Sequence, residues 1–242
     1  MADLYRQAGL ARAQAEIERK LAADGIRKTQ TLEGENVNYI PHSTGEDYLH
    51  KARGLTHFLH YVRSYSLTRT ILDIGTGTSE AIDQIARSPL GSGLHFIATA
   101  LTRHPKMANF IGNIFRTSAE YLEGVKKESI GGVIAIQSIG FSKAPNIVAA
   151  KLEQVVALGG IVKATFRKKT PYSQVWEDNY NQWEYNTYDK FRDALMKYGW
   201  DVAVHSGVEG DDTQDDILVA IKHGGSRTAQ EVLEADLNDY AV

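Results

Sequence analysis

The stretch Thr70-Ile-Leu-Asp73-Ile-Gly75-Thr-Gly77-Thr-Ser79-Glu80 decides how this chain folds. Its first part, residues 70–74, is mostly β-branched or leucine, which is typical of a strand buried on both faces. Gly75 and Gly77 have no Cβ, so the backbone can turn sharply there and approach a ligand closely. Apolar residues then recur at helical spacing, at Ala81, Ile82, Ile85 and Ala86. Open α/β sheets bind small cofactors at such a strand, turn and helix.

Strands and helices alternate along the chain after this stretch. Six further strands are predicted at 94–99, 114–117, 132–137, 161–166, 201–208 and 216–222. Helices are predicted to begin at Pro105 and to span 119–126, 144–157 and 188–198. The alternation predicts an α/β fold, a doubly wound seven-stranded sheet that is mostly parallel. The link 209–215 is too short for a helical crossover, so the last strand is predicted to be antiparallel.

The ends of the chain are predicted to lie outside this sheet. Residues 2–24 have a helical apolar stripe, whereas residues 26–42 have no periodicity. The S-x-x-E pattern at 43–46 predicts the start of another helix, which runs to about Tyr65. The predicted domains are an N-terminal helical arm or cap over 1–66, a sheet domain over 67–225 and a polar C-terminal tail over 226–242.

Composition excludes several classes of protein. The net charge of −3 gives no bulk attraction to nucleic acid, and no apolar run is long enough for a membrane span. The absence of cysteine excludes disulfides, thiolate catalysis and cysteine-ligated metals. With no signal-peptide pattern, we expect a cytoplasmic protein, for which the N-terminal arm is a candidate homodimer element.

Three histidines on the helix before Tyr65 raise the question of a metal site. His50, His57 and His60 lie roughly opposite the apolar stripe of that helix. This position indicates a solvated face, because metal ligands need support from neighbouring protein groups. No metal site is therefore predicted.

Two common cofactor motifs do not fit the glycine turn. A phosphate-binding P-loop needs G-x-x-x-x-G-K-[ST], which is absent from the chain. A dinucleotide site needs G-x-G-x-x-G, and Glu80 stands at the third glycine position. That site also needs an acid about 20 residues further on, and 97–102 contains none.

The segment Leu72–Ser79 resembles the first motif of class I S-adenosylmethionine-dependent methyltransferases, a family with a Rossmann-like fold. The resemblance extends over about 70–222. It includes the glycine pair in 158–161, the helix and aromatic turn in 191–200, and the antiparallel last strand. It implies that the cofactor is S-adenosylmethionine.

The resemblance also implies residue roles. Asp73 would orient the turn, and Gly75, Thr76 and Gly77 would line the methionine part of the cofactor. The full set of candidate cofactor-binding residues is Asp73, Gly75, Thr76, Gly77, Thr99, Ala100, Ser118, Ala119, Glu120 and Gln137. The family's ribose-binding acid falls at or next to Ala100, where this sequence has no acid. Either Glu120 or a threonine hydroxyl substitutes for it, or the role of the acid is lost.

Residues on the acceptor side are predicted at two places. Ser138 follows the fourth strand, where it either contacts the acceptor beside the expected methyl group or only caps the end of the strand. Tyr172, Trp176 and Tyr180 belong to an aromatic stretch over 167–187, which either forms a substrate lid or packs as a small satellite core. No catalytic residue is predicted, since alignment of the acceptor with the cofactor supplies much of the rate in a methyl transfer.

Three functions remain open at this point. The first is methyl transfer from S-adenosylmethionine to a small-molecule acceptor by in-line displacement. The second is a degenerate methyltransferase-like module for binding or assembly, which the missing acid at Ala100 supports. The third is an RNA or protein methyltransferase.

Overall fold

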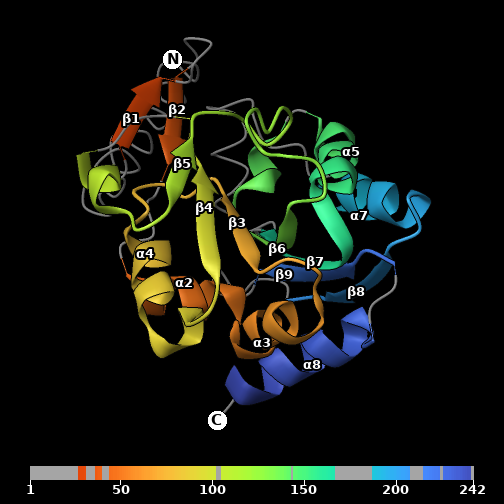
Figure 1. Ribbon diagram of the computed structural model, residues 1–242. Helices are drawn as coiled ribbons and strands as arrows, with labels where there is room; N and C mark the ends of the chain where they lie inside the picture. The colour runs from red at the N-terminus through yellow and green to blue at the C-terminus, as the bar shows by residue number, and fades with distance from the viewer. Residues whose placement is uncertain are drawn as a thin grey trace, which may run out of the picture. The chain divides into compact units, whose positions relative to one another are not determined.

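A computed structural model describes residues 27–30, 36–39, 44–101, 105–142, 144–166, 187–207, 215–223 and 226–240 (Figure 1). The chain divides into two compact units, Met1–Pro41 and His42–Val242. The sequence places the boundary at residue 66, whereas here the helices before the sheet belong to the second unit. The helix predicted over 2–24 lies outside the described residues. In the first unit, β1 (Arg27–Gln30) and β2 (Asn36–Tyr39) pair antiparallel, although 26–42 has no sequence periodicity.

The second unit contains a seven-stranded sheet with the order β5-β4-β3-β6-β7-β9-β8. Its strands are β3 (Thr70–Ile74), β4 (His95–Thr99), β5 (Asn113–Phe115), β6 (Ile130–Ile136), β7 (Val156–Phe166), β8 (Asp201–His205) and β9 (Asp216–Ile221). Only β9 is antiparallel to its two neighbours, β7 and β8. The predicted doubly wound, mostly parallel sheet with an antiparallel last strand is therefore confirmed.

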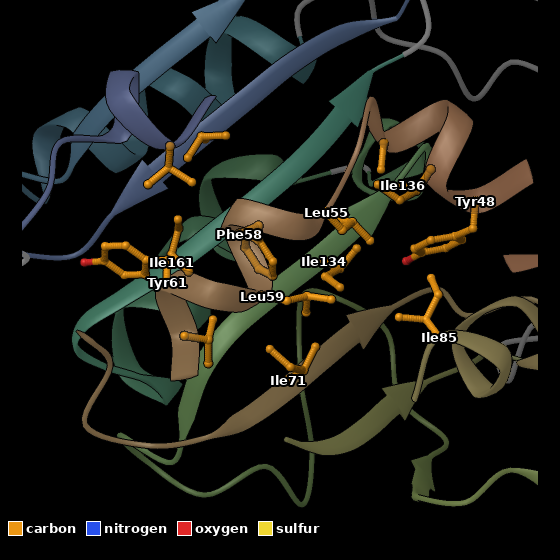
Figure 2. Packing of buried hydrophobic residues seen from close by; sticks show 14 of the residues in the cluster. Tyr48, Leu55, Phe58, Leu59, Tyr61, Ile71, Ile85, Ile134, Ile136 and Ile161 are labelled. Atoms are coloured by element: carbon orange, nitrogen blue, oxygen red, sulfur yellow. The ribbon is translucent and has the colours of Figure 1, made fainter. Parts of the chain in front are cut away.

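Helices cover both faces of this sheet (Figure 1). On one face are α2 (Gly45–Ala52), α3 (Thr56–Tyr65), α4 (Glu80–Arg87) and α8 (Ala229–Tyr240). On the other face are α5 (Pro145–Val155) and α7 (Thr187–Lys197). Short 3-10 turns are η1 (Pro89–Gly91), η2 (Pro105–Asn109) and η3 (Ile139–Phe141). Figure 2 shows the first face, where Leu55, just before α3, and Phe58 and Leu59 of α3 pack toward the sheet near Ile71 and Ile134.

The helix predicted to run to Tyr65 is two helices, because the chain breaks between α2 and α3. Arg53 and Gly54 both have positive φ, at 51° and 83°, which ends α2. A Cβ on Gly54 would lie 2.9 Å from the carbonyl oxygen of Asp236, so this position requires glycine. The break also allows α8 to pack against α3.

Two of the three histidines on the predicted solvated face, His50 and His60, are exposed, and His57 is intermediate. His50 hydrogen-bonds the hydroxyl of Tyr240, and Nε2 of His57 lies 2.9 Å from Oδ2 of Asp239, both on α8. Among the residues that the structure describes, no group of three or more His, Asp or Glu side chains could hold a metal ion.

Three other elements differ from the sequence-based expectation. Residues 119–126 form turns instead of a helix, because Leu122 and Gly124 have positive φ. Helix α5 ends at Val155, and β7 begins directly afterwards. The segment predicted as a polar tail contains helix α8, whose Val232, Leu233 and Asp236 are buried.

No helix in the described part of the chain is both long and apolar enough to cross a membrane.

Candidate functional site

The glycine turn after β3 is fixed against the neighbouring strand β4. The amide of Gly75 donates to Oγ1 of Thr99 at 3.2 Å, and the amide of Thr76 donates to the carbonyl of Thr99 at 3.0 Å. Gly75 and Gly77 have φ of 74° and 59°, a region that glycine adopts without strain. Gly75 is exposed, so the backbone of this turn is accessible from outside.

No side chain fits at the first position of the turn. A Cβ on Gly75 would lie 2.7 Å from Cβ of Ser138, which follows β6. The turn and the end of β6 therefore approach each other as closely as two backbones with one small side chain allow. This contact brings together two residues that the sequence predicts for the site.

Asp73, the acid on β3 just before the turn, is buried and hydrogen-bonded. Asp73 is 1% exposed and accepts a hydrogen bond from the hydroxyl of Tyr48, which is 3% exposed. Tyr48 lies on α2, before the sheet begins. Burial, followed by the charge and hydrogen bond of Asp73, raises the pKa of Tyr48 well above its ordinary value, so the hydroxyl stays protonated and remains a donor. Sequence reasoning does not assign Tyr48 to the site, because Tyr48 belongs to the apolar stripe of the helix predicted before Tyr65.

Four buried hydroxyl oxygens lie in segments that follow the carboxyl ends of β3, β5 and β6. They have no hydrogen-bond partner among the described residues, and they belong to Thr76, Ser79, Ser118 and Ser138. A buried polar group without a partner costs about 1–3 kcal/mol. Ordinary proteins leave few such groups unpaired, so these oxygens suit a ligand with several polar atoms.

The residue directly after β4 is the apolar Ala100, and a carboxylate lies on the segment after the next strand. Ala100 is buried, and its amide donates to the carbonyl of Phe115 at 3.1 Å. Glu120, two residues after Ser118, accepts a hydrogen bond from Oγ of Ser142 at 2.6 Å. Ser142 follows β6 and η3. The bond holds the carboxylate of Glu120 between the segments that follow β5 and β6.

The end of β6 bears an amide that reaches the start of β9. Gln137 has φ of 51°, and its backbone amide donates to the carbonyl and hydroxyl oxygens of Thr165 at 3.2 and 3.1 Å. Its side-chain Nε2 donates to Oδ2 of Asp215 at 2.6 Å. Asp215 is 6% exposed.

Sequence reasoning missed Asp215. The signal was its position directly before β9 (Asp216–Ile221), because the start of an antiparallel strand lies at the same edge as the ends of its parallel neighbours. A polar residue at that point therefore meets the residues that follow β6.

The predicted site residues fall into two groups. The predicted cofactor-binding residues and Ser138 lie at or just after the carboxyl ends of β3, β4, β5 and β6, on one edge of the sheet. Tyr172, Trp176 and Tyr180 lie outside the described residues.

No protein-family model matches the chain, and no curated protein matches it. Solved structures do match. A SAM-dependent methyltransferase from Archaeoglobus fulgidus has a TM-score of 0.55 at 15% identity, over 72% of this chain and 94% of that one. A 1,6-didemethyltoxoflavin-N1-methyltransferase from Burkholderia thailandensis, solved with its substrate and S-adenosylhomocysteine, has a TM-score of 0.52 at 13% identity, over 72% and 79%.

A third matching structure is that of a larger protein. The phosphoethanolamine N-methyltransferase 2 of Haemonchus contortus has a TM-score of 0.53 at 15% identity. The match spans 66% of this chain but half the length of that enzyme. Together with the strand order and the reversed β9, these matches identify the fold as that of SAM-dependent methyltransferases.

Proposed function

We propose that this chain, whose fold is that of class I SAM-dependent methyltransferases, binds S-adenosylmethionine at the glycine turn and transfers its methyl group to a small-molecule acceptor. One observation carries the proposal. The turn is accessible at Gly75, has no room for a side chain there, and lies beside buried hydroxyls that have no partner among the described residues. Such a site suits a ligand with several polar atoms that approaches the backbone closely.

The residues at this edge fit the chemical groups of the cofactor. The hydroxyls of Thr76, Ser79 and Ser138 suit the polar methionine part, next to the turn. Glu120, held by Ser142, supplies an acceptor for ribose hydroxyls or the adenine amine. The cofactor, when bound, supplies a methyl group on a positively charged sulfur, and the protein's task is to orient it and exclude water.

The acceptor is expected beyond β6, on the side of β7 and β9. Gln137 and Asp215 form a hydrogen-bonded pair there, so a polar acceptor finds both an amide and a carboxylate. A small acceptor is supported by the net charge of −3, which offers no large basic surface for RNA. Solved structures of the same fold include a 1,6-didemethyltoxoflavin-N1-methyltransferase and a phosphoethanolamine N-methyltransferase.

A second candidate function is a binding module that has lost catalysis. The observation in its favour is the buried, apolar Ala100 at the end of β4, where the family resemblance implies a ribose-binding acid. In that case Glu120 does not replace the missing acid, and the affinity for the cofactor is lost.

Calorimetric titration of the wild-type protein with S-adenosylmethionine and S-adenosylhomocysteine tests the proposal. We expect both to bind, and Ser138→Ala to weaken binding roughly fivefold, the contribution of one neutral hydrogen bond. The control is Ser64→Ala, because Ser64 is exposed on α3. If neither cofactor binds at millimolar concentration, the proposed methyltransferase function is contradicted, and the second candidate function, a binding module without catalysis, is favoured.

The acceptor class needs a separate measurement. Methyl-labelled S-adenosylmethionine is incubated with the protein and either a small-molecule extract or total RNA. Label in the small-molecule fraction supports the proposal. Label in RNA or in protein contradicts the small-molecule acceptor while keeping the enzyme.

A further inference from the structure

We propose that Tyr48 is a positioning residue for the cofactor turn, and that helix α2 clamps this turn in the shape that receives the methionine part of S-adenosylmethionine. The inference rests on the proposed function, because it assigns a role to a residue outside the turn itself. Tyr48 would act through Asp73 and would not touch the cofactor.

Helix α2 bonds to both sides of the turn. Before the turn, the hydroxyl of Tyr48 donates to Oδ1 of Asp73 on β3. After the turn, the amide of Gly45 donates to Oε1 of Gln84 on α4 at 2.6 Å. The two donors, Gly45 and Tyr48, are three residues apart on α2. The two acceptors, Asp73 and Gln84, are eleven residues apart and lie on either side of the turn. A helix bonded at both ends of a turn restricts how far those ends can separate.

The turn is held on its other side by β4. Thr99 accepts from the amides of Gly75 and Thr76. Two independent elements, α2 and β4, thus fix the backbone between Asp73 and Gln84. The positive φ of Ser79, 64°, falls within this segment, and a non-glycine residue keeps such a conformation only when its surroundings enforce it.

The hydroxyl of Tyr48 is not needed to fill space. Its ring lies in the apolar cluster with Ile85 and Ile136, and its oxygen points toward the interior (Figure 2). A phenylalanine would fill the same volume without the cost of burying a hydroxyl. The tyrosine is explained by its bond to Asp73, and because this bond reaches an acid two residues before Gly75, it acts on the turn.

The position of Asp73 predicts which part of the cofactor responds. Asp73 lies on β3, whereas Ser118 and Glu120 follow β5, the edge strand beyond β4. We expect the methionine part at β3 and the adenosine part toward β4 and β5. Loss of the Tyr48 hydroxyl should therefore disturb binding of S-adenosylhomocysteine and leave adenosine binding nearly unchanged.

The test compares Tyr48→Phe with Tyr61→Phe by calorimetry, with S-adenosylhomocysteine and adenosine as separate probes. Tyr61 is a matched control, since it is fully buried on α3 and its hydroxyl has no hydrogen-bond partner among the described residues. For Tyr48→Phe we expect roughly tenfold weaker binding of S-adenosylhomocysteine, the scale of a hydrogen bond to a charged group. Adenosine affinity should change less than about twofold, and Tyr61→Phe should change neither.

Each other outcome overturns the inference in a distinguishable way. If the wild type does not bind S-adenosylhomocysteine, the proposed function fails and the inference fails with it. If the wild type binds but Tyr48→Phe binds equally well, the inference alone fails. An equal loss for both probes, together with a lowered melting temperature, assigns Tyr48 a purely structural role.

Discussion

Lys163 and Asp236 form an ion pair in the core, with 2.7 Å between Nζ and Oδ2 and no exposure of either side chain. Nζ of Lys163 also donates to the carbonyl of Gly54 at 2.7 Å, and Oδ1 of Asp236 accepts from the amide of His57 at 2.8 Å. These bonds join β7, helix α8 and the break between α2 and α3. Helix α8 is therefore an integral part of the sheet domain.

The first prediction concerns the loss of one partner of this pair. Asp236→Ala leaves the ammonium group of Lys163 buried without its carboxylate, and we expect the free energy of unfolding to fall by about 3–5 kcal/mol. Burial already lowers the pKa of Lys163, against the opposing effect of Asp236, so removing the carboxylate favours the neutral amine further. Denaturant unfolding measures the change.

Two comparisons make this prediction specific. Asp239→Ala removes an exposed carboxylate from the same helix and should change stability by less than about 1 kcal/mol. Replacement of both partners, Lys163→Met with Asp236→Leu, should recover most of the lost stability, because an apolar pair carries no desolvation cost. A double variant as unstable as Asp236→Ala would contradict this account of the pair.

The second prediction concerns the start of α8. Thr228 and Glu231 form a capping box, in which the amide of Thr228 donates to Oε2 of Glu231 at 2.7 Å and the amide of Glu231 donates to Oγ1 of Thr228 at 3.2 Å. The backbone and side-chain hydrogen bonds from Thr228 lower the pKa of Glu231 below its ordinary value of 4.5. The folded state therefore binds this proton more weakly than the unfolded state.

The sign of the pH effect follows from that direction. The stabilisation is fully present above the ordinary pKa of Glu231 and is lost as the pH falls through the lowered one. We expect amide exchange in the first turn of α8 to speed up across this acid range beyond its intrinsic pH dependence. Glu231→Gln should flatten that change, whereas Glu234→Gln, one turn later on the exposed side, should not. The same acid-dependent change in Glu231→Gln would refute the assignment.

The doubly wound, mostly parallel sheet was predictable from the sequence because short apolar runs alternate with segments of helical pattern along most of the chain. The glycine turn was predictable because Gly75 and Gly77 are local signals. The Lys163–Asp236 pair and the Tyr48–Asp73 bond were not, since each joins residues that are far apart in sequence and only tertiary packing brings them together. The break at Gly54 follows from the same packing, because α8 approaches its backbone there.

The third prediction separates backbone strain from ligand approach at the turn. Gly75 and Gly93 have nearly the same φ, 74° and 75°, but a Cβ on Gly93 would meet nothing within 4 Å. Gly93→Ala should therefore cost only the left-handed strain, about 1–2 kcal/mol. Gly75→Ala adds the contact with Ser138 and should cost more.

The cofactor affinity of these variants is measured by calorimetry, and stability by denaturant unfolding. Gly75→Ala combined with Ser138→Gly removes the steric contact, so stability should return to that of Gly93→Ala. The new methyl group still occupies the approach to the turn, and binding of S-adenosylhomocysteine should stay weak. If the double variant binds as the wild type does, the turn does not receive the cofactor.

The fourth prediction concerns Glu120, the proposed substitute for the missing acid at Ala100. Its carboxylate is fixed by Ser142, and it follows β5, where the adenosine part is expected. Glu120→Gln should weaken binding of adenosine and S-adenosylhomocysteine by the same factor, roughly tenfold for a hydrogen bond to a charged group. This equal loss differs from the result expected for Tyr48→Phe, which should weaken binding of S-adenosylhomocysteine but not of adenosine.

Ser142→Ala distinguishes position from charge at Glu120. It keeps the carboxylate but removes the hydroxyl that holds it, so both affinities should fall by less than in Glu120→Gln. Glu123→Gln is the control, because Glu123 lies three residues away and is exposed. If Glu120→Gln binds adenosine as tightly as the wild type does, Glu120 does not recognise the cofactor, and the ribose then has no acid from either β4 or the segment after β5.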